Sequence, residues 1–511
     1  MIGIKSVITV TVVSLALASC GGGSVGSTTG SNPTPVASET YLNQVAVSGL
    51  TTNESVILQD NNANPITVSA NQTVTFPASW QTTNTYAVTV ASQTPGVTCG
   101  TSSASGTTGI ADVTVTVSCS AGTESVLYSF STGTDGASPN AGLITDANGN
   151  MYGTTSYGGS GRGAGTVFKL STSGSETVLY RFGTNSTRDG ANPQAGLIMD
   201  ANGNLYGTTL YGGSNGRGTV FKLTPNGSGY SETVLYSFGA TNPIGSTTDG
   251  ANPQAGLIMD ANGNLYGTTL YGGSNGKGTV FKLTPSGSET VLYSFGATNP
   301  IGSTTDGANP YASLIMDTYG NLYGTTLYGG NSNNGTVFKL TPNDSGYSET
   351  VLYSFGATNP IGSTTDGTYP YSSLIMDASG NLYGTTFDGG NNNKGTVFKL
   401  TPSGSETVLY SFGATNPIGS TTDGTNPYSS LIMDANGNLY GTTSGGGSKG
   451  NGTVFKLTPS GSETVLYNFG TSSATDGANP RAGLIMDANG NLYGTTYVGG
   501  TNNSGTIFKI N

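Results

Sequence analysis

The sequence contains no histidine, and only 8% of its residues are charged. Without histidine the chain lacks the usual general base near neutral pH and the commonest metal ligand, so a hydrolase triad built on histidine is excluded. Globular proteins average about 25% charged residues, so hydroxyl, amide and backbone groups must cover much of this surface. The formal net charge of −11 offers no basic patch for phosphates, which argues against nucleic acid as a partner.

A long hydrophobic run is also lacking. The apolar stretch Val7–Leu17 follows Lys5 and is shorter than the roughly 20 residues that span a bilayer. It is followed by Leu-Ala-Ser-Cys, ending at Cys20. The segment resembles a bacterial lipoprotein signal (residues 1–19), which implies cleavage before Cys20 and acylation of that residue; a plain secretory signal is the alternative.

Gly21 stands where aspartate would favour retention at the inner membrane, so the resemblance implies export and lipid anchoring to the bacterial outer membrane, on its periplasmic or its cell-surface side. Residues 20–39 are rich in Gly, Ser, Thr and Pro. This composition predicts a flexible tether between the lipidated cysteine and the folded parts.

Cysteine is scarce as well, with three in the chain. Besides Cys20, the pair Cys99 and Cys119 predicts a disulfide in an exported protein, with a redox or metal role as the alternative. Apolar and polar residues alternate through residues 40–120, as at Val45 and Val47, which predicts a small antiparallel β-sandwich. The single tryptophan, Trp80, is predicted to belong to its core.

What the chain has in abundance is repetition. From Glu124 onward one unit recurs seven times at a spacing of 52 to 60 residues, with four strand-like runs in each copy. In one copy the runs are Gly256–Asp260, Asn264–Thr269, Gly278–Leu283 and Glu289–Phe295. Lysines of the third run and glutamates of the fourth lie across one hairpin, and we expect them to pair across the strands. Four short strands per repeat are typical of β-propellers and solenoids.

The repeat is permuted along the chain. The first copy begins with the fourth run (Glu124–Phe130), and the last copy ends with the third run (Gly505–Ile510). A ring explains this arrangement, because the first run would complete the last blade and cover its free edge. The sequence therefore predicts an all-β protein in which residues 124–511 form a closed seven-bladed β-propeller of four-stranded blades.

The recurring blocks D-G-A-N-P, L-I-M-D-A-N-G-N-L-Y-G-T-T, Y-G-G and G-T-V-F-K-L-T resemble the GloVer tandem repeat, named for Gloeobacter and Verrucomicrobia. The likeness covers about three-quarters of the chain. It implies a β-propeller that is held at the cell surface by one of various anchors, and it implies no established activity.

Two sets of residues are candidates for a site on the face that carries the longer loops. One aspartate per repeat lies in the loop before the first run, and it could hold a cation such as calcium, anchor sugar hydroxyls, or cap its own turn. These residues are Asp135, Asp189, Asp249, Asp306, Asp366, Asp423 and Asp476. No cofactor is predicted beyond that possible calcium.

The second set differs from copy to copy. The residue just before the first run is predicted to lie at the mouth of the central channel, and around the ring it is Asn140, Gln194, Gln254, Tyr311, Tyr371, Tyr428 and Arg481. Tyr369 joins the tyrosine arc and Arg188 the amide arc. Tyrosine faces with amide and guanidinium groups suit a neutral or weakly acidic polar ligand, glycans above all, unless these residues simply fill a mouth that binds nothing.

These features favour a surface-anchored, non-catalytic binding or scaffold lipoprotein for polysaccharide or an envelope protein. Two alternatives remain. One is a propeller enzyme that uses a divalent cation, either gluconolactonase-like or glycan-cleaving, with calcium-ligating Asp and Asn or paired carboxylates. The other is a purely structural component of the cell envelope.

Overall fold

The computed structural model describes residues 43–50, 55–61, 63–76, 85–93, 97–102, 105–107, 113–121, 124–131, 133–159, 163–183, 189–227, 229–239, 248–296, 305–344, 346–356, 365–413, 423–470 and 475–511. The predicted signal and tether with Cys20, as well as Trp80 and Arg188, lie outside these residues. All regular secondary structure in the described ranges is β-strand. Those ranges contain no helix that is long and apolar enough to cross a membrane.

Eight strands make up the N-terminal part in two four-stranded sheets, ordered β4-β1-β8-β6 and β3-β2-β5-β7. Their bounds are β1 (Asn43–Ser48), β2 (Val56–Asp60), β3 (Ala63–Val68), β4 (Gln72–Thr75), β5 (Thr85–Gln93), β6 (Val97–Ser102), β7 (Ser105–Thr107) and β8 (Val113–Ala121). The expected pairing was antiparallel throughout, but β1 and β8 are parallel. The first and last strands of this part run in the same direction, side by side in one sheet.

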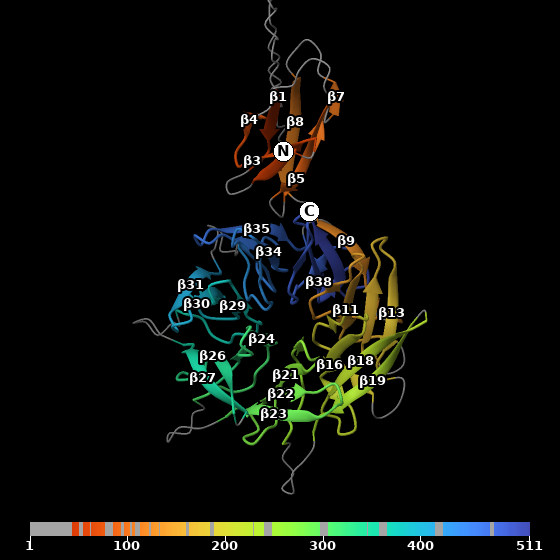
Figure 1. Cartoon of the computed structure of the whole chain (residues 1–511), viewed down its shortest axis with the longest axis vertical. Coiled ribbons are helices and arrows are strands. Elements are labelled where there is room, and N and C mark those ends of the chain that lie inside the picture. The colour runs from red at the N-terminus through yellow and green to blue at the C-terminus, as the bar shows by residue number, and fades with distance from the viewer. Residues whose placement is uncertain are drawn as a thin grey trace, which may run out of the picture.

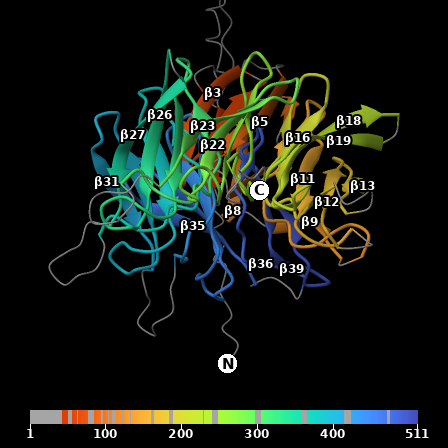
Figure 2. The same ribbon diagram turned by 90° about the horizontal axis from the view of Figure 1, so that it is seen from below.

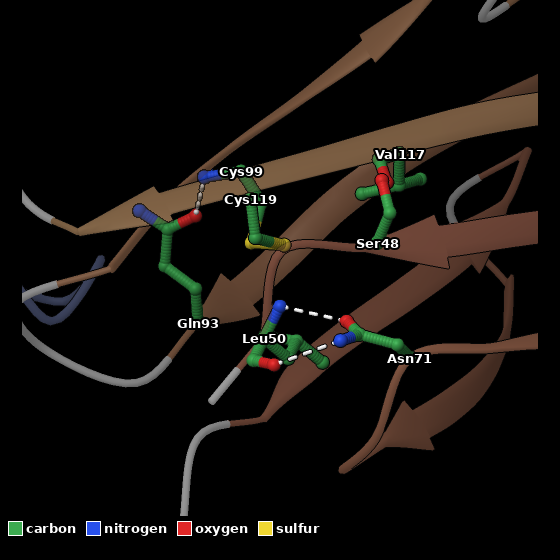
Figure 3. The surroundings of a disulfide bond; sticks show 7 residues. All are labelled: Ser48, Leu50, Asn71, Gln93, Cys99, Val117 and Cys119. Carbon is green, nitrogen blue, oxygen red and sulfur yellow. Dashed lines mark hydrogen bonds between the residues drawn. A yellow bond between two sulfur atoms is a disulfide. The ribbon is translucent and has the colours of Figure 1, made fainter. Parts of the chain in front are cut away.

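One hydrophobic cluster joins these two sheets. Val45 and Val47 of β1 and Val115 and Val117 of β8 are at most 4% exposed, as the alternation in the sequence predicts. The predicted disulfide between Cys99 and Cys119 is confirmed, and it joins residues that lie directly opposite each other on β6 and β8 (Figure 3).

Residues from 124 onward form seven four-stranded antiparallel sheets, each with an inner two-residue strand. In chain order they are sheet 1 with β10 (Ile144–Thr145), β11 (Met151–Thr155), β12 (Thr166–Leu170) and β13 (Glu176–Arg181); sheet 2 with β15 (Ile198–Met199), β16 (Leu205–Thr209), β18 (Thr219–Asn226) and β19 (Gly229–Ser237); and sheet 3 with β20 (Ile258–Met259), β21 (Leu265–Thr269), β22 (Thr279–Leu283) and β23 (Glu289–Ser294).

Sheets 4 to 6 repeat this order: β24 (Ile315–Met316), β25 (Leu322–Thr326), β26 (Thr336–Asn343) and β27 (Gly346–Ser354); β28 (Ile375–Met376), β29 (Leu382–Thr386), β30 (Thr396–Leu400) and β31 (Glu406–Ser411); and β32 (Ile432–Met433), β33 (Leu439–Thr443), β34 (Thr453–Leu457) and β35 (Glu463–Asn468). Two loop pairs add the short strands β14 (Gly190–Ala191) with β17 (Tyr211–Gly212), and β36 (Gly477–Ala478) with β39 (Val498–Gly499).

Sheet 7 contains strands from both ends of the repeat region. Its β37 (Ile485–Met486), β38 (Leu492–Thr496) and β40 (Thr506–Ile510) are followed in the sheet by β9 (Glu124–Ser129). Glu124 lies opposite Ile510 and Ser129 opposite Thr506. The pairing expected between the first run and the last strand is therefore present, and β40 has no free edge.

Hydrophobic contacts run from each sheet to the next and from the last back to the first. Between sheets 3 and 4, for example, Phe295 packs edge-on against Phe338 with ring centroids 5.0 Å apart. The equivalent contact between sheets 7 and 1 joins Phe130 to Phe168 at 5.1 Å. Figure 1 shows the sheets arranged around a common centre. In the perpendicular view, β27 and β31 lie on one side and β13, β18 and β19 on the other (Figure 2).

The glycine of each L-Y-G-T-T strand lies against the core without room for a side chain. A Cβ atom added to Gly267 would lie 2.7 Å from the Phe281 ring and 3.0 Å from Leu257. We expect Gly267→Ala to lower the free energy of unfolding by about 1–3 kcal/mol through overpacking. Gly229→Ala is the control, because its Cβ would meet nothing within 4 Å. Equal denaturation midpoints for the two variants would contradict this account.

Candidate ligand-binding site

A cavity of about 290 Å³ lies where the inner ends of the seven sheets meet. All seven residues predicted from the position before the inner strand line it. They are Asn140, Gln194, Gln254, Tyr311, Tyr371, Tyr428 and Arg481, and each is partly exposed. The wall below them consists of small and aliphatic residues of the same segments, among them Ser313, Ser373 and Ser430.

A proline directly before each of these residues sets its position. Pro253 is buried, and its Cδ lies 2.6 Å from where a Cβ of Gly218 in the preceding repeat would stand, so that glycine must lack a side chain. The preceding Asn252 has a φ of 57°, and its Nδ2 donates to the carbonyl of Leu210 at 2.9 Å. Each sheet is thus fixed to the previous one immediately before the residue that enters the cavity.

Tyr369 lies elsewhere, which differs from the expectation that it joins the tyrosine arc. It replaces the asparagine at this φ-positive position, with a φ of 57°, and its ring packs edge-on against Tyr328 at 5.6 Å. Because it precedes Pro370 instead of following it, its side chain belongs to the contact between loops.

The three tyrosines of the cavity contact one another. The rings of Tyr371 and Tyr428 stack with centroids 4.9 Å apart, and Tyr311 meets Tyr371 edge-on at 5.0 Å. The hydroxyls of Tyr311 and Tyr428 form a hydrogen bond. Burial raises the pKa of Tyr371 to about 12 and that of Tyr311 and Tyr428 as well, so all three phenols stay protonated at neutral pH.

Amide groups occupy the other arc. Asn140 Nδ2 donates to Gln194 Oε1 at 3.0 Å, and Gln254 Nε2 donates to the Tyr311 hydroxyl at 2.7 Å. Asn140 Oδ1 is buried and has no hydrogen-bond partner among the described residues. Beside this arc the guanidinium of Arg481 lies over the ring of Tyr497 at 4.0 Å and over that of Tyr428 at 5.9 Å.

The seven aspartates are held by hydrogen bonds within their own loops. The Asp249 carboxylate accepts from the Tyr236 hydroxyl at 2.8 Å and from Gly239 N, and the corresponding bonds recur at Asp306, Asp366 and Asp423. Asp476 accepts from Tyr467 and Gly470, Asp189 from Gly183, and Asp135 from Tyr128 and Ser131. This geometry is that of turn capping. Within the described ranges no group of three Asp, Glu, Cys or His residues is placed to hold a metal ion.

The glutamate that begins the fourth run of each repeat has a role that the sequence did not predict. Glu289 was expected to pair with a lysine, but it lies opposite Leu283, and the lysine before that leucine lies opposite Thr290. Neighbouring residues of a strand point to opposite faces, so the two charges are separated. Lys282 instead lies over the Tyr266 ring, with its Nζ 5.7 Å from the centroid.

Each of these glutamates faces the capping aspartate of the loop before its own sheet. Burial and the Asp249 charge raise the pKa of Glu289 to about 7, and its Oε1 is buried without a hydrogen-bond partner in the described residues. At every other sheet boundary, burial and the charge of an aspartate likewise raise the pKa of a glutamate whose Oε1 is buried without a partner in the described residues. The value is about 7 for Glu124, Glu176, Glu232, Glu349 and Glu406, and about 8 for Glu463. The sequence signal was the invariant spacing of these residues, but their approach to the aspartates depends on how neighbouring sheets pack.

The fold and the cavity define an all-β repeat protein with one candidate site at the centre of its seven sheets. The chain belongs to the Gloeobacter/Verrucomicrobia repeat family, which it matches at residues 84–304, 244–364 and 361–511. No protein of curated function matches it.

Solved structures resemble the chain only distantly. A protein assigned as a gluconolactonase is 14% identical with a TM-score of 0.35, and the match covers 68% of this chain and 94% of that one. A protein from Bacteroides uniformis assigned as a 6-phosphogluconolactonase is 15% identical with a TM-score of 0.41, covering 69% and 88%. A luciferin-regenerating enzyme is 12% identical with a TM-score of 0.37, covering 76% and 95%. At these values the likenesses carry no argument about function.

Proposed function

We propose that the seven sheets are the blades of a closed β-propeller and that its central cavity binds a small polar ligand, with saccharides as the leading class, without catalysing a reaction. The pairing of β9 with β40 and the Phe130–Phe168 contact support the closure. The volume of about 290 Å³ is at the lower end of ligand pockets, which fits a single sugar unit or a chain end.

One observation carries this proposal. The position that enters the cavity carries four residue types in seven copies, although the proline directly before it is present in every copy. Packing alone would allow one residue type at all seven places. Instead, tyrosines cover one arc and amides with a guanidinium cover the other, and this combination offers both an apolar face and hydrogen bonds to one ligand.

The same chemistry favours binding over hydrolysis. The described residues that line the cavity include no carboxylate, whereas glycoside cleavage uses two. The Asp–Glu pairs lie at the sheet boundaries instead of in the cavity, and all seven pairs have the same arrangement, so none stands out as a catalytic pair. The enzyme alternative has its own test: turnover of a lactone or glycan that a chelator abolishes would overturn the non-catalytic function.

We further propose that Cys20 is lipidated and that residues 20–39 tether the protein to the outer membrane, where polysaccharide or an envelope protein would be within its reach. The support is the apolar run followed by Leu-Ala-Ser-Cys and the Gly/Ser-rich segment behind it. Metabolic labelling with a palmitate analogue, lost in Cys20→Ala, is the expected result.

The binding function can be tested on an array of bacterial glycans with the full-length protein. We expect Tyr371→Ala to weaken binding about three- to tenfold, because the stacked ring face is lost. Tyr319→Ala is the matched control, since this tyrosine is 84% exposed on a hairpin outside the cavity. Absence of binding to any glycan, or equal effects of the two variants, would overturn the proposal and favour a structural role.

A further inference from the structure

The charge of the cavity is unlike that of the chain. The sequence has 27 acidic and 16 basic residues, yet the residues that line the cavity include one full charge, the guanidinium of Arg481. The other six copies carry an amide or a phenol at that position. A ligand that enters the cavity therefore meets a single positive charge and no carboxylate in its wall.

This guanidinium has no partner that neutralises it. In the described part of the chain Arg481 makes ring contacts with Tyr497 and Tyr428, and neither a hydrogen bond nor an ion pair engages its five N–H donors. The Tyr497 ring, 4.0 Å away, fixes the plane of the guanidinium without supplying a negative charge. A partly buried cation without a counter-ion is costly, so this arrangement leaves an anion to be provided from outside.

The surrounding groups match such an anion. Burial raises the pKa of Tyr311 and Tyr428, and the charge of Arg481 acts against that rise, so its field reaches the cavity. The charge of Asp388 acts on Tyr371, but this carboxylate is outside the cavity lining and already has partners, since it accepts from Asn426 Nδ2 at 3.0 Å and interacts with the charge of Lys394. Asn140 also lines the cavity, and its Oδ1 is buried without a hydrogen-bond partner in the described residues, so a rotation of this amide would let it accept from a ligand hydroxyl.

We propose that the ligand of this cavity carries a carboxylate that pairs with the guanidinium of Arg481, while its hydroxyl groups meet the amide arc and its apolar face meets Tyr371. A uronic acid unit has this chemistry. The planar fork of the guanidinium matches a carboxylate through two parallel hydrogen bonds, which a neutral sugar cannot form. This inference rests on the proposed binding function and narrows it to acidic saccharides.

The test measures binding of D-glucuronate, D-glucose, glucose 6-sulfate and acetate to the full-length protein by calorimetry and saturation-transfer NMR. We expect glucuronate to bind about tenfold more tightly than glucose, as for one charge-assisted pair. Arg481→Gln should abolish this preference, and Arg481→Lys should retain part of it. Arg217→Gln, which removes an exposed charge outside the cavity, is the control and should change nothing.

The outcomes separate this inference from the function on which it rests. Equal affinities for glucuronate and glucose would overturn the carboxylate site and leave saccharide binding intact, and a preference for glucose 6-sulfate over glucuronate would also overturn it. Binding of acetate with no binding of either sugar, lost in Arg481→Gln, would support the carboxylate site and overturn the saccharide function. If none of the probes binds, both proposals fail.

Discussion

Raising the pH from 5 to 8 should lower the thermal stability of this protein, although it contains no histidine. Seven glutamates, one at each sheet boundary, have a pKa raised by burial and by a neighbouring aspartate, to about 7 for Glu289 and to about 8 for Glu463. In the unfolded chain these carboxyls ionise near their ordinary value of 4.5. Between those two values the folded protein binds more protons than the unfolded chain.

The sign follows from proton linkage. Because unfolding releases protons in this window, the free energy of unfolding is highest below about pH 4.5 and decreases as the pH rises through about 7. Solvent screening reduces the shifts of these partly exposed groups. Even the equivalent of one bound proton shared among all seven sites lowers the free energy of unfolding by about 1.4 kcal/mol per pH unit.

A second set of carboxyls acts at lower pH and does not cancel this trend. Burial opposes ionisation of hairpin aspartates such as Asp260, but bonds from Asn264, Tyr266 and Asn262 outweigh it and hold the pKa below the ordinary value. These aspartates add to the free energy of unfolding at any pH above their ordinary pKa of 3.8, and this addition is lost only as the pH falls below 3.8. We therefore expect the free energy of unfolding to be highest at about pH 4 to 5, because the aspartates stabilise the fold above their ordinary pKa of 3.8 and the glutamates begin to destabilise it above their ordinary pKa of 4.5.

Thermal unfolding followed by circular dichroism at pH 4 to 9 checks this expectation. Replacing all seven glutamates by glutamine should remove the fall in melting temperature between pH 5 and 8, and Glu289→Gln alone should remove a small part of it. Lys282→Gln on the neighbouring strand is the control for a lost surface charge. A melting temperature that is constant or rises from pH 5 to 8 would show that the Asp–Glu pairs are not coupled as described.

Deleting β9 should prevent the repeat region from folding stably. The strand completes sheet 7 by pairing with β40, and Phe130 at its end is fully buried against Phe168. Loss of one buried phenylalanine side chain costs about 3–5 kcal/mol, a large share of the 5–15 kcal/mol typical of a folded domain. The deletion also exposes the edge of β40, which invites aggregation.

Three shortened chains test this closure. Residues 124–511 keep β9 and should fold, whereas residues 131–511 should aggregate or melt at a much lower temperature. Attaching residues 124–130 behind Ile510 through a Thr-Pro-Ser-Gly-Ser hairpin, as in sheets 3, 5 and 6, should restore the melting temperature. Equal stability of the first two chains would contradict the closure, and failure of the permuted chain would show that β9 acts through its link to the N-terminal part.

Much of the architecture could be predicted because it depends on local spacing. The recurring Thr-Val-Phe-Lys-Leu run is a short apolar run typical of a strand buried on both faces, and the Asn-Gly turns give short hairpins, so strand positions follow directly. The parallel pairing of β1 with β8 could not be predicted, since alternation is the same in either direction. Tyr369 was misplaced because the proline after it, not its nearness to Tyr371, decides which side chain enters the cavity.

By itself, the sequence determined the number of repeats, the strands in each and the seven positions that enter one cavity, because these follow from periodicity, and the disulfide, because Cys99 and Cys119 are the two cysteines besides Cys20. Only the tertiary structure decided which side chains meet across sheets. In the folded protein Glu289 lies near Asp249, and the hydroxyls of Tyr311 and Tyr428 form a hydrogen bond across the cavity. The guanidinium of Arg481 lies over aromatic rings without a counter-ion in the described residues. Such contacts depend on the packing of neighbouring sheets, which no local pattern within a repeat encodes.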